Sequence, residues 1–83
     1  MRIYMQIPAT DGNPPRFCHL ILQKELLEGW SLIRETGQQG KAGRVRRQYF
    51  ASHEEALAAL MKERDQQLRR GYQVVFFRGE APE

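Results

Sequence analysis

The stretch SHEEALAALMKERDQQLRRG, residues 52–71, decides the fold class of this 83-residue chain. Ser52 followed by Glu55 is typical of a capping box, in which each side chain satisfies a backbone donor at the start of a helix. Gly71 suits the left-handed position after a helix end. One helix is therefore predicted, with an apolar stripe that packs on a sheet. We expect this stripe to comprise Ala56, Leu57, Leu60, Met61 and Leu68, with Lys62, Glu63 and Gln66 facing away.

Strand-like runs lie on both sides of this helix. Residues 2–7 alternate apolar and polar side chains, and residues 16–23 form a mostly apolar run after a Pro-rich loop. Residues 30–34 and 44–50 predict two more strands, separated by a flexible connection with glycine at 37, 40 and 43. Residues 72–77, rich in β-branched and aromatic side chains, predict the last strand. The expected fold is α+β, a mainly antiparallel sheet of about five strands packed against one helix.

The length of the chain predicts one small domain. We expect an N-terminal strand and turn-rich loop over residues 1–15, the main domain over residues 16–78, and a flexible C-terminal tail over residues 79–83. No apolar stretch approaches the roughly 20 residues that a membrane-spanning helix needs. The single Cys18 cannot form an internal disulfide, and the first residues lack the layout of a secretory signal. A cytoplasmic location is therefore expected.

The residues offer no pattern typical of catalysis, metal binding or cofactor binding. Cys18 and His19 are adjacent, and adjacent strand residues point to opposite faces, so they make a poor nucleophile and base pair. One Cys and two His give no metal-ligand spacing. The three clustered glycines lack the Gly-Lys-Ser/Thr of a phosphate-binding P-loop. We expect no enzymatic activity, no metal and no cofactor.

Positive charge is concentrated in one window of the chain. The formal net charge is +3, but residues 34–47 hold five cations against the single acid Glu35. Arginine binds phosphate through a planar fork of donors, and a nearby aromatic ring adds a stacking surface. The window therefore predicts contact with a nucleic-acid backbone. The alternative is a solvated strand face that discourages edge-to-edge pairing. The candidate binding residues are Arg34, Lys41, Arg44, Arg46, Arg47 and Tyr49.

The same region resembles a known family. Residues 29–46 read GWSLIRETGQQGKAGRVR, in which a strand ending in Arg-Glu runs on to Gly-Arg-Val-Arg. An aromatic residue, a Ser-capped helix and Arg-Gly-Tyr follow, at Phe50, residues 52–56 and residues 70–72. This order resembles the small, stand-alone, bacterial-type members of the WGR domain family over roughly residues 17–74, within the predicted main domain. The resemblance implies a nucleic-acid-binding module, with DNA favoured over RNA as partner.

The family takes its name from a Trp-Gly-Arg triplet, which is Thr36-Gly37-Gln38 in this chain. In poly(ADP-ribose) polymerases, the resemblance implies that the Trp stacks against a DNA terminus and the Arg contacts the backbone, while the domain relays damage to a catalytic domain. Thr36 has no flat face for stacking, and Gln38 hydrogen-bonds but brings no charge. DNA-end recognition in that mode is therefore not expected.

Two classes of function follow from these residues. The first is a non-enzymatic module that contacts DNA phosphates through the arginine cluster. The alternative is a protein-interaction or adaptor module on a WGR scaffold that has lost DNA-end recognition. In that case residues 2–7 or the apolar residues 74–77 would pair, as uncovered strands, with a partner protein or with a second copy of the chain.

Overall fold

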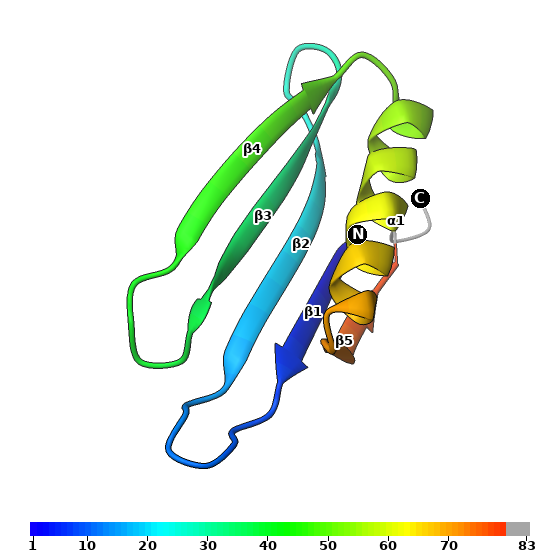
Figure 1. Cartoon of the computed structure of the whole chain (residues 1–83). Coiled ribbons are helices and arrows are strands. Elements are labelled where there is room, and N and C mark those ends of the chain that lie inside the picture. The colour runs from blue at the N-terminus through cyan, green and yellow to red at the C-terminus, as the bar shows by residue number, and fades with distance from the viewer. Residues whose placement is uncertain (80–83) are drawn as a thin grey trace.

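The computed structural model describes residues 1–79, so most of the predicted tail over residues 79–83 lies outside the described residues. The strands form one antiparallel sheet in the order β4-β3-β2-β1-β5, and the helix lies across one face (Figure 1). This is the α+β architecture predicted from the sequence. The elements are β1 (Arg2–Ile7), β2 (Arg16–Lys24), β3 (Trp30–Gln38), β4 (Arg44–Phe50), α1 (His53–Arg69) and β5 (Gln73–Arg78).

β3 is longer than predicted, and the expected flexible connection is correspondingly shorter. The strand continues to Gln38 because β2 pairs with it along its whole length, as far as Arg16. Gly37 therefore lies inside a strand, opposite Phe17, and a Cβ added there would lie 3.3 Å from that ring. Of the three clustered glycines only Gly40 has a positive φ, of 86°. Gly37 thus serves close packing of a side chain rather than loop flexibility.

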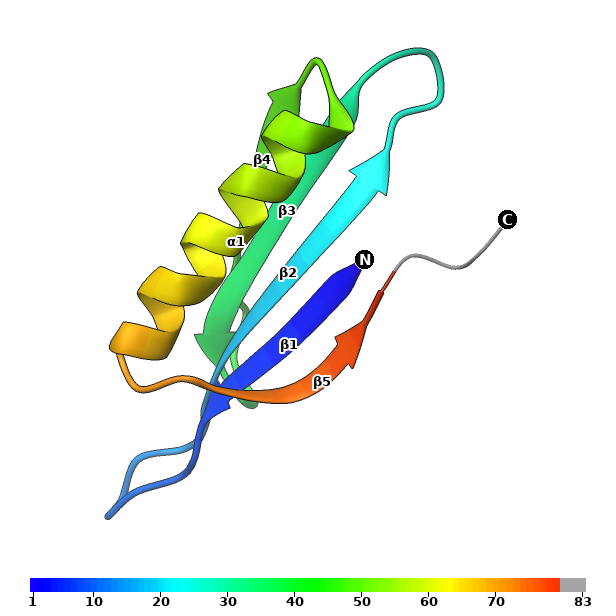
Figure 2. The same cartoon turned by 90° about the vertical axis from the view of Figure 1, so that its right-hand side faces the viewer.

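β1 is an interior strand, paired with β2 on one side and with β5 on the other (Figure 2). The prediction that residues 2–7 form an uncovered strand was wrong, because the C-terminal strand returns past the helix to cover that edge. The two edges of the sheet are β4 and β5. β4 carries arginines, which discourage pairing with another chain, whereas β5 carries a run of exposed apolar side chains at residues 74–77.

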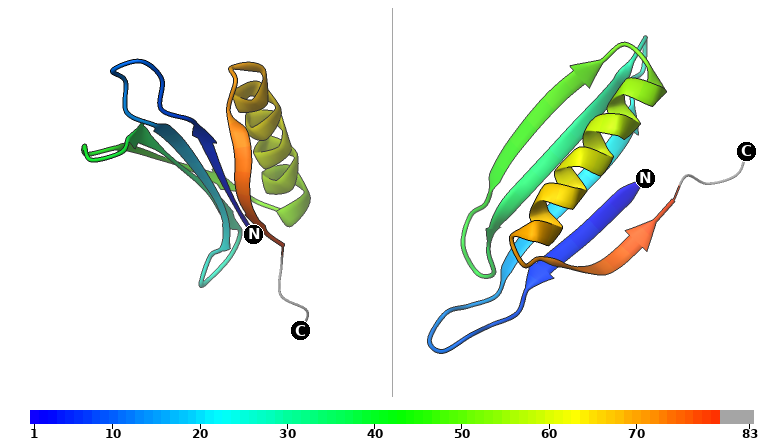
Figure 3. Two further views of the ribbon diagram at one scale, coloured as in Figure 1. Left: turned by 90° about the horizontal axis from the view of Figure 1, so that it is seen from below. Right: turned by 45° about the vertical axis from the view of Figure 1, so that its right-hand side comes forward.

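The helix begins and ends where the sequence predicted. The Ser52 side chain accepts a hydrogen bond from the Glu55 amide at 3.2 Å, and Gly71 adopts a φ of 102° just beyond the helix. α1 packs on β2, β3 and β4 (Figure 3). Its buried Ala56 and Leu60 join apolar residues of the sheet to form the core. Those sheet residues are Ile3, Met5, Cys18, Leu20, Leu22 and Leu32, with Tyr72 at the start of the last segment. No helix within residues 1–79 is long and apolar enough to cross a membrane.

Two helix residues lie opposite to their predicted positions. Glu63, expected to face away, points to the sheet and accepts hydrogen bonds from Arg34 and Gln67. Leu68, expected in the apolar stripe, is 42% exposed, whereas Gln67 is buried. For Glu63 the reason is that β3 places the Arg34 guanidinium under the helix, where a carboxylate compensates its charge.

Side-chain alternation gives the sheet two unlike faces. We call the face under α1 the covered face; it holds Leu32 and Arg34 of β3. The other, the open face, holds Ile33 and Glu35 of the same strand and their cross-strand neighbours. In the part of the chain that the structure describes, no element packs on the open face (Figure 3).

Candidate nucleic-acid interface

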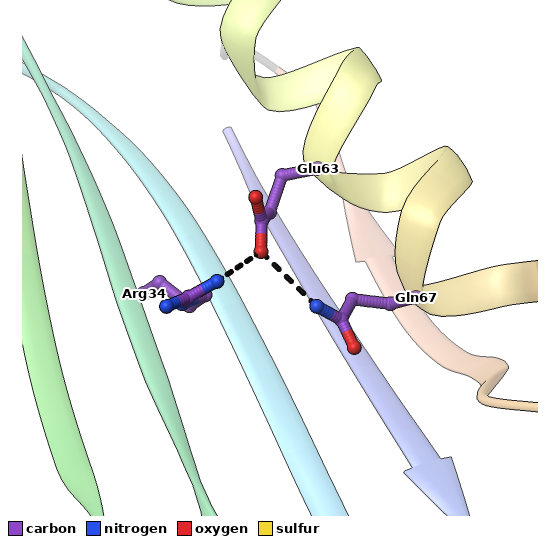
Figure 4. A network of polar contacts seen from close by, with 3 residues as sticks. All are labelled: Arg34, Glu63 and Gln67. Carbon is purple, nitrogen blue, oxygen red and sulfur yellow. Dashed lines mark hydrogen bonds and ion pairs between the residues drawn. The ribbon is translucent and has the colours of Figure 1, made fainter. Parts of the chain in front are cut away.

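The residues of the predicted arginine cluster lie in three different environments in the structure. The first is the covered face, where Arg34 and Arg46 lie opposite each other on β3 and β4. Arg34 donates to a Glu63 oxygen that also accepts from the Gln67 amide at 3.0 Å (Figure 4). The Arg34 side chain is only 30% exposed. Arg34 is therefore engaged in attaching the helix to the sheet.

The charges of both arginines act on the pKa of Glu63, and Arg34 contributes more than Arg46. Burial by itself would raise the pKa of Glu63, but hydrogen bonds from Arg34 and Gln67, with the charges of Arg34 and Arg46, outweigh it and lower the pKa below its ordinary value of 4.5. Two like charges directly opposite each other on adjacent strands repel. The Glu63 carboxylate, which is bonded to Arg34, reduces that repulsion.

The second environment is the open face at the β4 edge, where Arg47 and Tyr49 lie. The Arg47 guanidinium is 3.7 Å from a Glu25 oxygen, and the same carboxylate accepts a hydrogen bond from the buried Ser31 hydroxyl. Tyr49, paired with Ser31 across the strands, is 70% exposed. Arg47 is thus partly neutralised by a neighbouring loop, and the Tyr49 ring is accessible.

The third environment is a cleft of about 630 Å³ at the end of the sheet where β2 begins and β3 ends. The loop between β1 and β2 forms one wall and the turn between β3 and β4 the other; both connections lie at the same end of the sheet (Figure 1). Three cations line this cleft, Arg16, Lys41 and Arg44, and none of its lining residues is acidic. An uncompensated group of cations in a concave site attracts anions.

The three positions equivalent to the family triplet also line this cleft: Thr36, Gly37 and Gln38. They contribute a hydroxyl, a stretch of backbone and a side-chain amide, all able to hydrogen-bond an anion. The fold therefore brings the motif positions together with Lys41 and Arg44, but not with Arg34, Arg46, Arg47 or Tyr49.

Sequence reasoning missed Arg16 and Tyr72, which also line the cleft. Arg16 is directly opposite Gln38 across the hairpin of β2 and β3. This pairing would have been found if β3 had been predicted at its full length. Tyr72 is 6% exposed and belongs to the core cluster, while also reaching the cleft.

Cys18 lies buried in the core, outside this cleft. Burial raises the pKa of the Cys18 thiol to about 11, which disfavours the reactive thiolate. Within residues 1–79, no three His, Cys, Asp or Glu side chains gather as metal ligands do.

The comparisons with known proteins agree with this geometry. The family model described as the WGR domain matches residues 1–77, and the match includes β1 as well as the triplet region. Neither the curated proteins nor the solved structures contain a match. The family model spans nearly the whole chain, and the triplet positions lie together in one cleft. The chain therefore belongs to the WGR domain family, a family of nucleic-acid-binding modules.

Proposed function

We propose that this protein is a non-enzymatic module that binds DNA by its phosphate backbone, with the cleft at the end of the sheet as the principal contact. The observation that carries the proposal is the lining of the cleft, which has Arg16, Lys41 and Arg44 and no carboxylate. Arginine and lysine bound to phosphate release condensed counterions, which favours association at low salt.

The cleft suits a backbone contact rather than a reading of bases. Its cations come from the start of β2 and from the turn and strand that follow β3, so they surround the Thr36 and Gln38 side chains. Those two polar groups add hydrogen bonds to phosphate oxygens but carry no charge. Phosphate contacts fix position and orientation without sequence information. We therefore expect similar affinity for duplexes of unrelated sequence.

The test is fluorescence anisotropy with a labelled duplex at two salt concentrations. The double variant Lys41→Ala/Arg44→Ala should weaken binding to every sequence alike, and should lower the salt slope by about 0.9 for each phosphate that is no longer neutralised. The matched control is Lys62→Ala/Arg64→Ala, which removes the same two residue types from the helix. This control should bind as the wild type does. The proposal is wrong if the wild type binds no duplex or single strand at low salt, or if both double variants weaken binding equally.

A second candidate function, protein interaction, is favoured by one further observation. The edge strand β5 exposes four apolar side chains at residues 74–77, each between 46% and 61% exposed. The β2–β3 loop adds Leu26 and Leu27, which are almost fully exposed. An open, apolar edge strand can add a strand from another chain. On this reading the module would be an adaptor or a homodimer through β5.

Light scattering at high protein concentration tests the second candidate. Pairing through β5 predicts a dimer that Val75→Lys converts to a monomer, because the substitution places a charge on the edge. A wild-type protein that remains a monomer at millimolar concentration would exclude the homodimer. Failure to recover any partner protein on the immobilised chain would exclude the adaptor function.

A further inference from the structure

The open face carries a cluster of aromatic rings on three adjacent strands. The Tyr4 and Phe17 rings lie nearly parallel, 9° apart in plane, with centroids separated by 6.1 Å. The His19 ring meets the Tyr4 ring at 74°, with centroids 5.5 Å apart. Phe76 of β5 is paired with Tyr4 in the strand register and so lies on the same face. Four rings therefore extend from β2 across β1 to the β5 edge.

Packing within the chain accounts for only part of this cluster. The Phe17 ring lies over Gly37 and Gly43, where an added Cβ would come within 3.3 Å of it. That close packing explains why an aromatic side chain is placed there. Phe76 has no such role, because it is 50% exposed on an edge strand. Since α1 lies on the other face of the sheet (Figure 3), no helix within residues 1–79 covers the face that carries these rings.

The charges beside the rings indicate an anionic ligand. Arg2 and Arg78 are paired across β1 and β5, both are exposed, and no carboxylate within residues 1–79 forms an ion pair with either. Arg47 extends the same cross-strand row, though Glu25 partly neutralises it. Glu35 is the carboxylate in the aromatic row, paired with His19. Like charges directly opposite each other destabilise a sheet, and a bound phosphate between them would reverse that effect.

We propose that the open face is a stacking platform for the bases of single-stranded nucleic acid, with Phe76 and Tyr4 as stacking residues and Arg2 and Arg78 as phosphate contacts. The inference rests on the proposed nucleic-acid function and adds a second surface to it, on the face opposite to the arginines under the helix. Aromatic side chains on an open sheet face stack unpaired bases in other single-strand-binding modules. A duplex cannot use such a platform, because its bases are already stacked and paired.

The experiment compares two oligomers that have the same phosphates and differ in their bases. One is a short labelled oligothymidine, and the other is the same length of abasic deoxyribose phosphate. The wild type should bind the oligothymidine at least about fivefold more tightly, because base stacking on aromatic side chains contributes that much or more per base. Phe76→Ala should abolish most of this preference while leaving the affinity for the abasic oligomer and for a blunt duplex unchanged.

Phe77→Ala is the matched control. Phe77 is the adjacent residue of the same strand, is 55% exposed, and is paired with the buried Ile3, which places it on the other face. It should keep the preference for thymidine. Tyr4→Leu, which retains an apolar side chain, should reduce the preference as Phe76→Ala does.

The outcomes separate this inference from the proposed function. The stacking platform is wrong if the wild type binds duplex and oligothymidine but does not prefer oligothymidine to the abasic oligomer. It is also wrong if both phenylalanine variants behave alike. In either case the proposal that the cleft binds phosphates is unaffected. If no nucleic acid binds at low salt, both are wrong. Light scattering of Phe76→Ala and Phe77→Ala shows whether either change acts through self-association instead, which would also overturn the platform.

Discussion

Two pairs of arginines face each other across neighbouring strands, and the structure treats them differently. Arg34 and Arg46 lie on the covered face, where Glu63 of the helix is held by hydrogen bonds from Arg34 and Gln67. Arg2 and Arg78 lie on the open face, and within the described chain neither forms an ion pair. Of these four arginines, Arg34 is therefore structural, whereas Arg2 and Arg78 are exposed and form no ion pair within residues 1–79.

This difference shows that positive charges close together along the chain need not lie on one surface. The window of residues 34–47 supplies two cations to the cleft, two to the covered face and one to the open face. The cleft gains its third cation, Arg16, from outside the window. Burial and ion pairing decide which positive charges are accessible to a ligand. Their spacing along the chain does not.

The largest expected effect is on the free energy of unfolding, when an apolar side chain is truncated on one face of the sheet or the other. Leu20 is fully buried on the covered face, so Leu20→Ala should lower the free energy of unfolding by about 2–5 kcal/mol. Its neighbour Ile21 is half-buried on the open face, and Ile21→Ala should cost about 1 kcal/mol. Urea denaturation measures both. Equal losses would mean that the open face is covered in solution.

The second prediction concerns the charge compensation of Arg34 by Glu63 on the covered face. Glu63→Gln removes the charge that is bonded to Arg34 and should lower the free energy of unfolding by about 1–3 kcal/mol. Glu54→Gln, an exposed position on the same helix, should change it by about 0.5 kcal/mol or less. The lowered pKa of Glu63 gives a second readout. Its contribution is present above its ordinary pKa of 4.5 and is lost as the pH falls through the folded value, so acid should destabilise the wild type more than Glu63→Gln.

The third prediction uses a titrating group on the open face. Burial, with the charge of Arg2, lowers the pKa of His19 below 6.5, although Glu35 opposes the shift. Because the unfolded chain then binds more protons, stability should fall slightly as the pH drops through 6.5, well before Glu63 titrates. The His19→Asn variant should lack this slope in thermal unfolding between about pH 7.5 and about pH 5.5. An NMR titration that places the pKa of His19 above 6.5 would contradict the prediction.

The smallest expected effect has the opposite sign. Arg78→Gln removes one of two like charges on the open face and should stabilise the protein by about 0.2–1 kcal/mol at low salt, with less effect at high salt. Arg46→Gln should give no stabilisation, because Glu63 already compensates that arginine. Thermal unfolding of both variants at two salt concentrations measures the contrast. A stabilising Arg46→Gln would show that Glu63 serves Arg34 alone.

Local sequence signals predicted the elements well where each signal is complete within a short segment. The Ser52 cap, the glycine at 71 and the alternation of residues 2–7 need no distant partner, and all three were confirmed. The end of β3 could not be predicted in this way, because residues 35–38 have weak strand preferences and are held by pairing with β2. The interior position of β1 likewise depends on where the C-terminal strand returns.

The candidate cleft was predictable only in part. The sequence identified Lys41, Arg44 and the triplet positions 36–38, because they are close together along the chain. It could not identify Arg16, which reaches the cleft through strand pairing across a long hairpin. It also grouped Arg34 with the binding residues, since nothing local shows that a helix carboxylate almost thirty residues later would engage it.

The sequence by itself determined the element types, the α+β class and the family, because periodicity, capping residues and motif order are properties of the chain. Tertiary structure alone decided which face each arginine occupies and which charges are compensated. The physical reason is that strand register and helix docking fix the partners of each charge, and these partners are far apart in sequence. Two results of that placement are Glu63 between the helix and the sheet, and Arg2 beside Arg78 at the edge of the aromatic rings.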